Sequence, residues 1–176
     1  MIETLISSKT RIKLLLKFFL NSNTTAYLRN LESEFGESTN SIRLELNRLE
    51  GAGFITSKSA GNKKIFQANP KHPLFGEIHN ILLKHLGLDH IIEEVIMRLG
   101  KVEKVYLAGS FSKGIDSKVI DLIIIGDIDS TYLIHLIDKA ERMIHRKISY
   151  LLYQSQEWNA EYLDQYQPAP LLMYSH

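Results

Sequence analysis

Two stretches of helical periodicity, separated by only a few residues, constrain the fold of this chain more than any other feature. In the first, residues 27–35, apolar side chains recur at intervals of three and four, and Gly36 ends the pattern. In the second, residues 40–49, the same spacing returns with Ile42 as its first inward position. Such spacing is typical of amphipathic helices, and a connection this short predicts a helix-turn-helix.

The segment before this pair predicts one further helix. Residues 7–10 form a cluster of capping residues, and apolar side chains from Ile12 to Leu20 follow at helical spacing. We expect this helix to face the core and to stop at residues 21–23. We then expect Thr24 or Thr25 to cap the second helix.

The segment after the pair predicts a β-hairpin. Residues 54–57 and 63–68 are typical of extended chain, and a polar turn at residues 59–62 separates them. The order helix, helix, helix, hairpin, with the sequence LNRLEGAGFITSKSAGNKKIFQANPKHPLF after the turn, resembles the ArsR-type winged-helix regulators. The resemblance implies that the third helix enters the major groove of DNA and that the hairpin, or wing, touches the backbone or minor groove.

The third helix and the wing also suit DNA by their own chemistry. A helix fits the major groove, short polar side chains at its start reach base edges, and lysines meet phosphates. A polar face used only for protein contacts is the alternative. The candidate DNA-binding residues are Ser38, Thr39, Asn40, Ser41, Arg43, Asn47, Arg48, Lys58, Lys63 and Lys64.

Charge divides the chain into two halves of opposite sign. Residues 1–87 hold twelve Lys and Arg against seven Glu, whereas residues 88–176 hold nine against thirteen Asp and Glu. A basic half suits a phosphate-binding surface, although this excess is modest. We therefore expect a winged-helix domain at residues 1–70, a linker helix at residues 71–88 and a second domain at residues 89–176.

The linker helix offers a surface for self-association. Pro73 stands at its first turn, and an apolar stripe runs on to His85. The stripe either packs inside the chain or pairs with a second subunit, because a winged helix reads half of a palindromic site and gains affinity as a dimer. The histidines of this region are expected to be ordinary helix residues, and a ligand cluster is the alternative; they are His72, His79 and His85.

The second half carries a motif of its own. Residues 102–108 predict a strand, Gly109-Ser110 a turn, and residues 119–125 a β-branched strand. The sequence VYLAGSFSKGIDSKVIDLIIIGDID resembles the nucleotidyltransferase superfamily that includes minimal nucleotidyltransferases and polymerase β. The resemblance implies a mixed sheet, nucleotide binding at Gly109 and Ser110, and a magnesium site at Asp121.

The acidic residues of that motif are incomplete. Two metal ions need at least two carboxylates, and the partner position, two residues before Asp121, is Val119. The third acid of the family is matched by Ser149 on the next strand, residues 146–153. We therefore expect no catalytic residue, no metal site and no cofactor, with magnesium and a nucleoside triphosphate bound only if the site still works.

These observations predict an α+β protein with an N-terminal winged helix-turn-helix and a C-terminal nucleotidyltransferase-like mixed sheet. The absence of cysteine excludes disulfides and thiolate zinc sites, and no apolar run is long enough to cross a membrane, so we expect a cytoplasmic protein. We expect a transcriptional regulator that binds double-stranded DNA as a homodimer, its second domain serving dimerisation or the sensing of a ligand such as a nucleotide. An active nucleotidyltransferase and a protein-interaction module are the alternatives.

Overall fold

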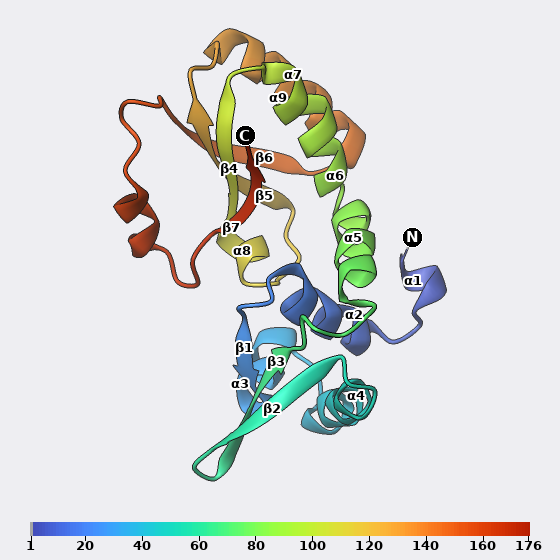
Figure 1. The fold of residues 1–176 in the computed structure, drawn as a ribbon. Coiled ribbons are helices and arrows are strands. Elements are labelled where there is room, and N and C mark those ends of the chain that lie inside the picture. The colour runs from blue at the N-terminus through green and yellow to red at the C-terminus, as the bar shows by residue number, and fades with distance from the viewer. Residues whose placement is uncertain (1) are drawn as a thin grey trace. The chain divides into compact units, whose positions relative to one another are not determined.

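The computed structural model describes residues 2–176 and divides into two compact units, Met1–His85 and Leu86–His176. Unit 1 combines helices with a small sheet (Figure 1). Its elements are α1 (Ile2–Leu5), α2 (Lys9–Leu15), the π-helical η1 (Leu16–Leu20), β1 (Thr25–Tyr27), α3 (Leu28–Phe35), α4 (Thr39–Gly51), β2 (Ile55–Ala60), β3 (Lys63–Ala68) and α5 (Phe75–Leu86), the last of which ends at the start of unit 2.

The predicted helices of unit 1 are confirmed. Ser8 caps α2 by accepting a hydrogen bond from the Arg11 amide, and Ser38 caps α4 in the same way from the Ser41 amide. Gly36 closes α3 in the left-handed conformation that glycine adopts without strain. The apolar faces of these helices meet in a core whose fully buried side chains include Leu14, Phe18, Phe19, Leu31, Ile42 and Leu46.

The expected capping of the second helix by Thr24 or Thr25 is wrong. Thr25 to Tyr27 form β1, which pairs antiparallel with β3, and α3 begins only at Leu28, without a side-chain cap. The sheet of unit 1 is therefore three-stranded, in the order β1-β3-β2. Pairing with a strand about forty residues further along the chain stabilises this short extended segment. No local pattern in its three residues predicts that pairing.

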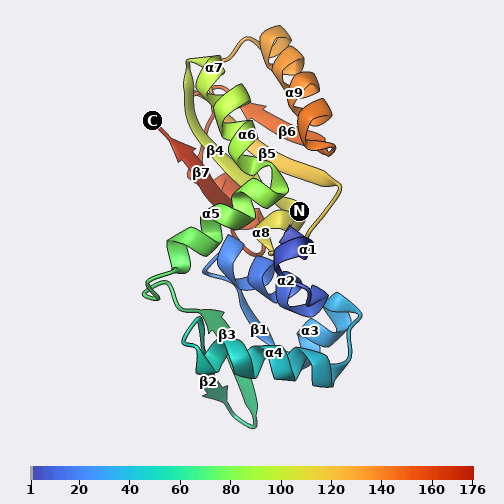
Figure 2. The same ribbon diagram turned by 90° about the vertical axis from the view of Figure 1, so that its right-hand side faces the viewer.

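The hairpin is confirmed with a tighter turn than expected. Ser59 and Ala60 belong to β2 and pair with Lys64 and Lys63, so that only two residues, starting at Gly61, connect the strands. Gly61 has a φ of 64°, which a two-residue hairpin turn requires and which glycine provides. The hairpin extends as a long two-stranded arm (Figures 1 and 2).

The helix expected to be the linker corresponds to α5, and it begins at Phe75 rather than at Pro73. Leu82 is fully buried, whereas Ile81 is half exposed, as is Leu74 just before the helix. The apolar stripe is thus only partly covered within residues 2–176. The Nδ1 atom of His79 lies 2.8 Å from the Phe19 carbonyl oxygen, so this ring contacts the residues of η1.

Unit 2 is a four-stranded mixed sheet with helices on one face (Figures 1 and 2). The strand order is β6-β5-β4-β7, with β5 and β6 parallel and the other pairs antiparallel. This confirms the predicted α+β class. Its elements are α6 (Leu88–Ile91), the π-helical η2 (Ile92–Ile96), α7 (Met97–Leu99), β4 (Val102–Ala108), α8 (Gly109–Ser112), β5 (Val119–Gly126), α9 (Ser130–Ile144), β6 (Lys147–Tyr153), the 3₁₀ helix η3 (Ala160–Gln165) and β7 (Leu171–Ser175).

An aromatic cluster covers part of the other face of this sheet. Trp158, Leu163 and Tyr166, from the segment between β6 and β7, pack against a buried group that includes Ile123 and Ile125. The helical turn in this segment is η3, which starts at Ala160. Trp158 lies before it, and its ring stacks 6.0 Å from that of Tyr106 on the sheet.

The apolar residues near the C-terminus form β7, which pairs with the edge of β4. None of the helices in the described part of the chain, residues 2–176, has the length and apolar character needed to span a lipid bilayer.

Candidate functional site

The outward face of α4 carries several of the predicted DNA-binding side chains. Asn40, Arg43, Asn47 and Arg48 are all exposed, whereas Ile42, Leu46 and Leu49 anchor the opposite face in the core. Side chains separated by three or four positions lie on one side of a helix, so Asn40, Arg43 and Asn47 share a face. Leu44, exposed to 50%, is an apolar member of the same surface that the sequence analysis did not select.

A hollow of about 600 Å³ lies between α4, the start of α3 and the tip of the wing. It brings together five predicted residues from α4 and β3. It also adds Arg29, Asn62 and Tyr27, which the sequence analysis missed because they come from a turn and from a helix expected to be structural. The lining holds four cationic side chains and a single acidic one, Glu32, so its charge suits an anionic ligand. Its lining residues are Tyr27, Leu28, Arg29, Glu32, Thr39, Arg43, Asn47, Asn62, Lys63, Lys64 and Phe66.

Other predicted residues lie differently. The hydroxyl of Ser41 is 3.0 Å from that of Thr10 on α2, so this side chain points into the module rather than out of it. Ser38 is exposed but serves as the helix cap. Lys64 lies 3.6 Å from Glu50, which reduces its free charge, and Lys58 is exposed on β2 outside the hollow.

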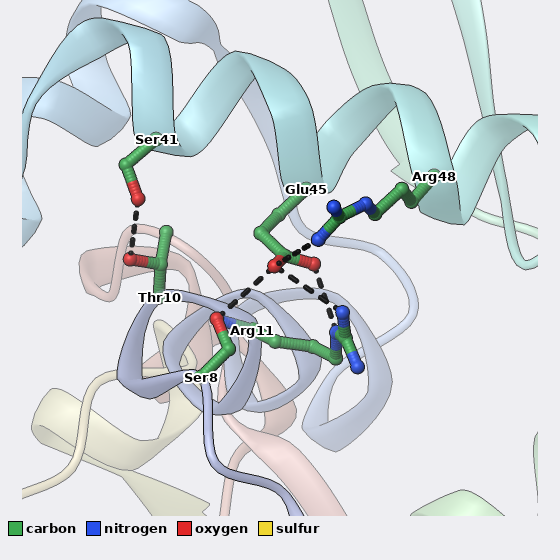
Figure 3. Close-up of polar contacts among 6 residues, drawn as sticks. All are labelled: Ser8, Thr10, Arg11, Ser41, Glu45 and Arg48. Carbon is green, nitrogen blue, oxygen red and sulfur yellow. Dashed lines mark hydrogen bonds and ion pairs between the residues drawn. The ribbon is translucent and has the colours of Figure 1, made fainter.

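Glu45 on α4 binds Arg11 of α2 and the capping residue Ser8, and so connects the two helices (Figure 3). Its buried carboxylate accepts hydrogen bonds from Arg11 Nε at 2.8 Å, from Ser8 Oγ at 3.1 Å and from Arg48 Nη1 at 3.0 Å. Burial alone would raise the pKa of Glu45, but the hydrogen bonds from Arg11 and Ser8 outweigh it and hold the pKa below its ordinary value. The contact fixes the helix that presents the polar face, and it occupies Arg48.

Unit 2 contains a second hollow, of about 680 Å³, at the predicted nucleotide motif. Gly109 and Asp121 both line it, whereas Ser110 does not, and Ser112 stands in its place. Further walls come from β6, at Ser149 to Leu151, and from the end of η3 with the residues after it, a segment that the sequence does not connect with the motif. Its lining residues are Ala108, Gly109, Ser112, Lys113, Asp121, Leu122, Ile123, Ser149, Tyr150, Leu151, Gln165, Tyr166, Gln167 and Pro168.

Only glycine fits at position 109. Its φ is 62°, and a Cβ atom added there would lie 2.0 Å from Oδ2 of Asp121. The carboxylate of Asp121 therefore lies directly over the backbone of the turn. This close approach brings the two conspicuous residues of the motif together.

The acidic residues present do not fit a two-metal site. Asp121 pairs in register with Ser149 on β6, so the neighbouring strand offers a hydroxyl where the resemblance requires a carboxylate. Val119, half exposed, stands two residues before it on the same side of β5. Within residues 2–176 no three side chains of the His, Cys, Asp or Glu type are grouped so that they could hold a metal ion. The donor set therefore lacks the hard oxygen ligands that two magnesium ions need.

Comparison with known proteins gives only distant structural matches. No family model matches the chain, and neither does any curated protein sequence. Similar solved structures include AF1382 from Archaeoglobus fulgidus, with 16% identity, coverage of 47% of this chain and 93% of that one, and a TM-score of 0.39. A mutant MntA–HpeT toxin–antitoxin complex has 18% identity, coverage of 51% and 72%, and a TM-score of 0.40. The Shewanella oneidensis HEPN toxin in complex with the MNT antitoxin has 16% identity, coverage of 53% and 73%, and a TM-score of 0.38. Similarity at this level carries no argument about function.

Proposed function

We propose that this protein is a cytoplasmic transcriptional regulator whose first unit binds double-stranded DNA in the manner of the ArsR-type winged helices. One observation carries the proposal. The exposed polar face of α4 and the basic hollow beside it form one continuous surface, which includes Arg43 and Asn47 from the helix and Lys63 from the wing. A helix with such side chains suits base edges, and the flanking cations suit phosphates.

The remaining predicted contacts follow from the same surface. Asn40 and Thr39 lie at the start of α4, from which side chains of a recognition helix reach bases. Arg29, at the start of α3, adds a fourth cation to the lining of the hollow. Arg48 and Ser41 are weaker candidates, because both already have partners inside the module.

A salt titration tests this proposal. Fluorescence anisotropy of a labelled duplex, selected from a random pool, is measured from low to high salt. The variant Lys63→Ala/Lys64→Ala should reduce the slope of log affinity against log salt by up to about two units, because each lysine facing one phosphate releases about one counterion. The exposed Lys118→Ala in unit 2 is the control. If the slope of the double variant equals that of the control, the wing does not contact DNA.

Base recognition is tested separately. Arg43→Ala should weaken binding to the selected duplex by about tenfold or more, yet weaken binding to an unrelated duplex much less, since good base contacts discriminate by ~1–3 kcal/mol. Equal losses of affinity on both duplexes would indicate that Arg43 contacts phosphates rather than bases. No binding by the wild-type protein would favour the protein-interaction module.

The second unit, in this proposal, serves as a dimerisation or ligand-sensing domain rather than as an enzyme. The hollow at Gly109 and Asp121 is large enough for a small ligand, and a nucleotide is one candidate. Active transfer of a nucleotidyl group is disfavoured because Val119 and Ser149 replace two carboxylates. Calorimetry with ATP, with and without magnesium, on the wild-type protein and on Asp121→Ala tests this. Heat of binding that Asp121→Ala removes would indicate a nucleotide site, and no heat in either protein would indicate a vestigial turn.

A further inference from the structure

Strand β6 forms an edge of its sheet that lacks most of the usual protection against pairing with another strand. Within residues 2–176, β6 has a neighbour on one side only, because it stands at the end of the order β6-β5-β4-β7. Its seven residues pair with β5 without a register shift, so the strand is regular along its whole length. Natural proteins protect free edges with charges, prolines or bulges, and residues 148–153 contain no charge and no proline.

The backbone contacts show which amides face outward. The Lys147 amide donates to the Lys118 carbonyl at 2.9 Å, on the β5 side. The next amide, that of Ile148, donates instead to Oε1 of Glu141 on α9 at 2.8 Å, away from β5. Successive residues of a strand alternate, so the N–H and C=O groups of Tyr150 and Leu152 also face the free edge.

Glu141 therefore satisfies the first outward amide, and within residues 2–176 no strand pairs with the next two. The same carboxylate binds Lys147 Nζ at 2.6 Å, which neutralises the only charge of the strand. Apolar surface lies beside the open part, since Leu151 on β6 is exposed to 48%. On α9, Ile134 is exposed to 51% and lies two turns from Glu141, on the same flank of the helix.

We propose that β6 pairs antiparallel with β6 of a second copy of this chain, about a twofold axis at Leu151. In this register Tyr150 of each copy faces Leu152 of the other, and both residues donate and accept across the axis. Leu151 then lies directly opposite its counterpart as a non-hydrogen-bonded pair, the arrangement that brings side chains closest. Lys147 faces Ser155, so no like charges oppose each other.

The second edge of the sheet is a poorer surface for such pairing. The pairing of β4 with β7 shifts register between Val105 and Tyr106, and such an irregularity twists an edge away from a flat partner. Leu172 on β7 is exposed to 49%, almost the same as Leu151. It therefore provides a matched control for every substitution at Leu151.

The pairing gives the dimer that the proposed function calls for, but its test needs no DNA, so the two proposals fail independently. The mass of the full-length protein is measured by light scattering after size exclusion over a range of concentrations. The wild-type protein and Leu172→Lys should be dimers. Leu151→Lys removes two apolar side chains from the axis and sets two like charges against each other, which should raise the dissociation constant by roughly 100-fold or more. Circular dichroism verifies that each variant is folded.

Cross-linking then locates the axis. Because the chain has no cysteine, each single variant reports one position. Under mild oxidation Leu151→Cys should form a disulfide-linked dimer, whereas Leu172→Cys and Ile134→Cys should not. A monomeric wild-type protein, a dimer that survives Leu151→Lys, or equal cross-linking at position 172 would each overturn the proposal.

Discussion

Removing the carboxylate of Glu45 should destabilise unit 1 and leave unit 2 unchanged. The Glu45 side chain is exposed to only 7%, and Arg11, exposed to 37%, contacts it through two nitrogens. Glu45→Ala removes these charge-assisted hydrogen bonds and the one from Ser8. Loss of one partner of a fully buried ion pair costs about 3–5 kcal/mol, but Arg11 can regain water, so we expect ~2–3 kcal/mol.

Two spectroscopic signals separate the units in urea unfolding. Trp158 is the only tryptophan of the chain and packs on the sheet of unit 2, so its fluorescence follows that unit. Circular dichroism follows the helices of both units. Glu45→Ala should shift the dichroism transition to lower urea without moving the fluorescence transition. Arg48→Ala, whose side chain is 64% exposed, is the control and should lose less than ~1 kcal/mol.

The pH dependence follows from the sign of the pKa shift. Burial opposes the charged form of Glu45, but the hydrogen bonds from Arg11 and Ser8 prevail, and the folded pKa lies below the ordinary value of 4.5. The stabilisation is therefore complete well above pH 4.5 and is lost as the pH falls through the folded pKa. The stability difference between wild-type protein and Glu45→Gln should shrink with acidification below that value. A Glu45→Ala loss no larger than that of Arg48→Ala, or a difference independent of pH, would refute this account.

Two further predictions concern the turn of unit 2 and the cap of α4. Gly109→Ala forces a left-handed alanine against Asp121 and should destabilise unit 2 by ~2–3 kcal/mol, measured by Trp158 fluorescence. Adding Asp121→Ala should recover about 1 kcal/mol of this loss. Strictly additive losses in the double variant would contradict the close contact. Ser38→Ala removes the hydrogen bond to the Ser41 amide and should cost unit 1 ~1 kcal/mol by circular dichroism, whereas Ser38→Asp should retain the stability; equal losses in both variants would argue against capping.

Local patterns in the sequence determined much of unit 1. The spacing of apolar residues and the capping residue Ser38 predicted α4, because a helix depends on contacts within a few residues. Gly36 and Gly61 likewise predicted the end of α3 and the turn of the wing, because glycine readily adopts the left-handed conformation that both positions have. The β-branched run predicted β5, and the family resemblance placed Ser149 on the strand beside Asp121, as the register shows.

Only the tertiary structure decided which residues share a surface. Strand β1 exists because β3 lies beside it, and Arg29 joins the basic hollow because that strand sets the start of α3. Ser41 and Arg48 look like free surface residues in the sequence, but Ser41 contacts Thr10 of α2, and Arg48 contacts Glu45, a neighbour on α4 that also binds Arg11 of α2. Pairings between distant segments depend on packing energies summed over the whole core. These energies do not produce a periodic pattern that can be recognised in the sequence. The contacts of a polar residue are therefore set by the fold, whereas its position on a helix is set by its neighbours.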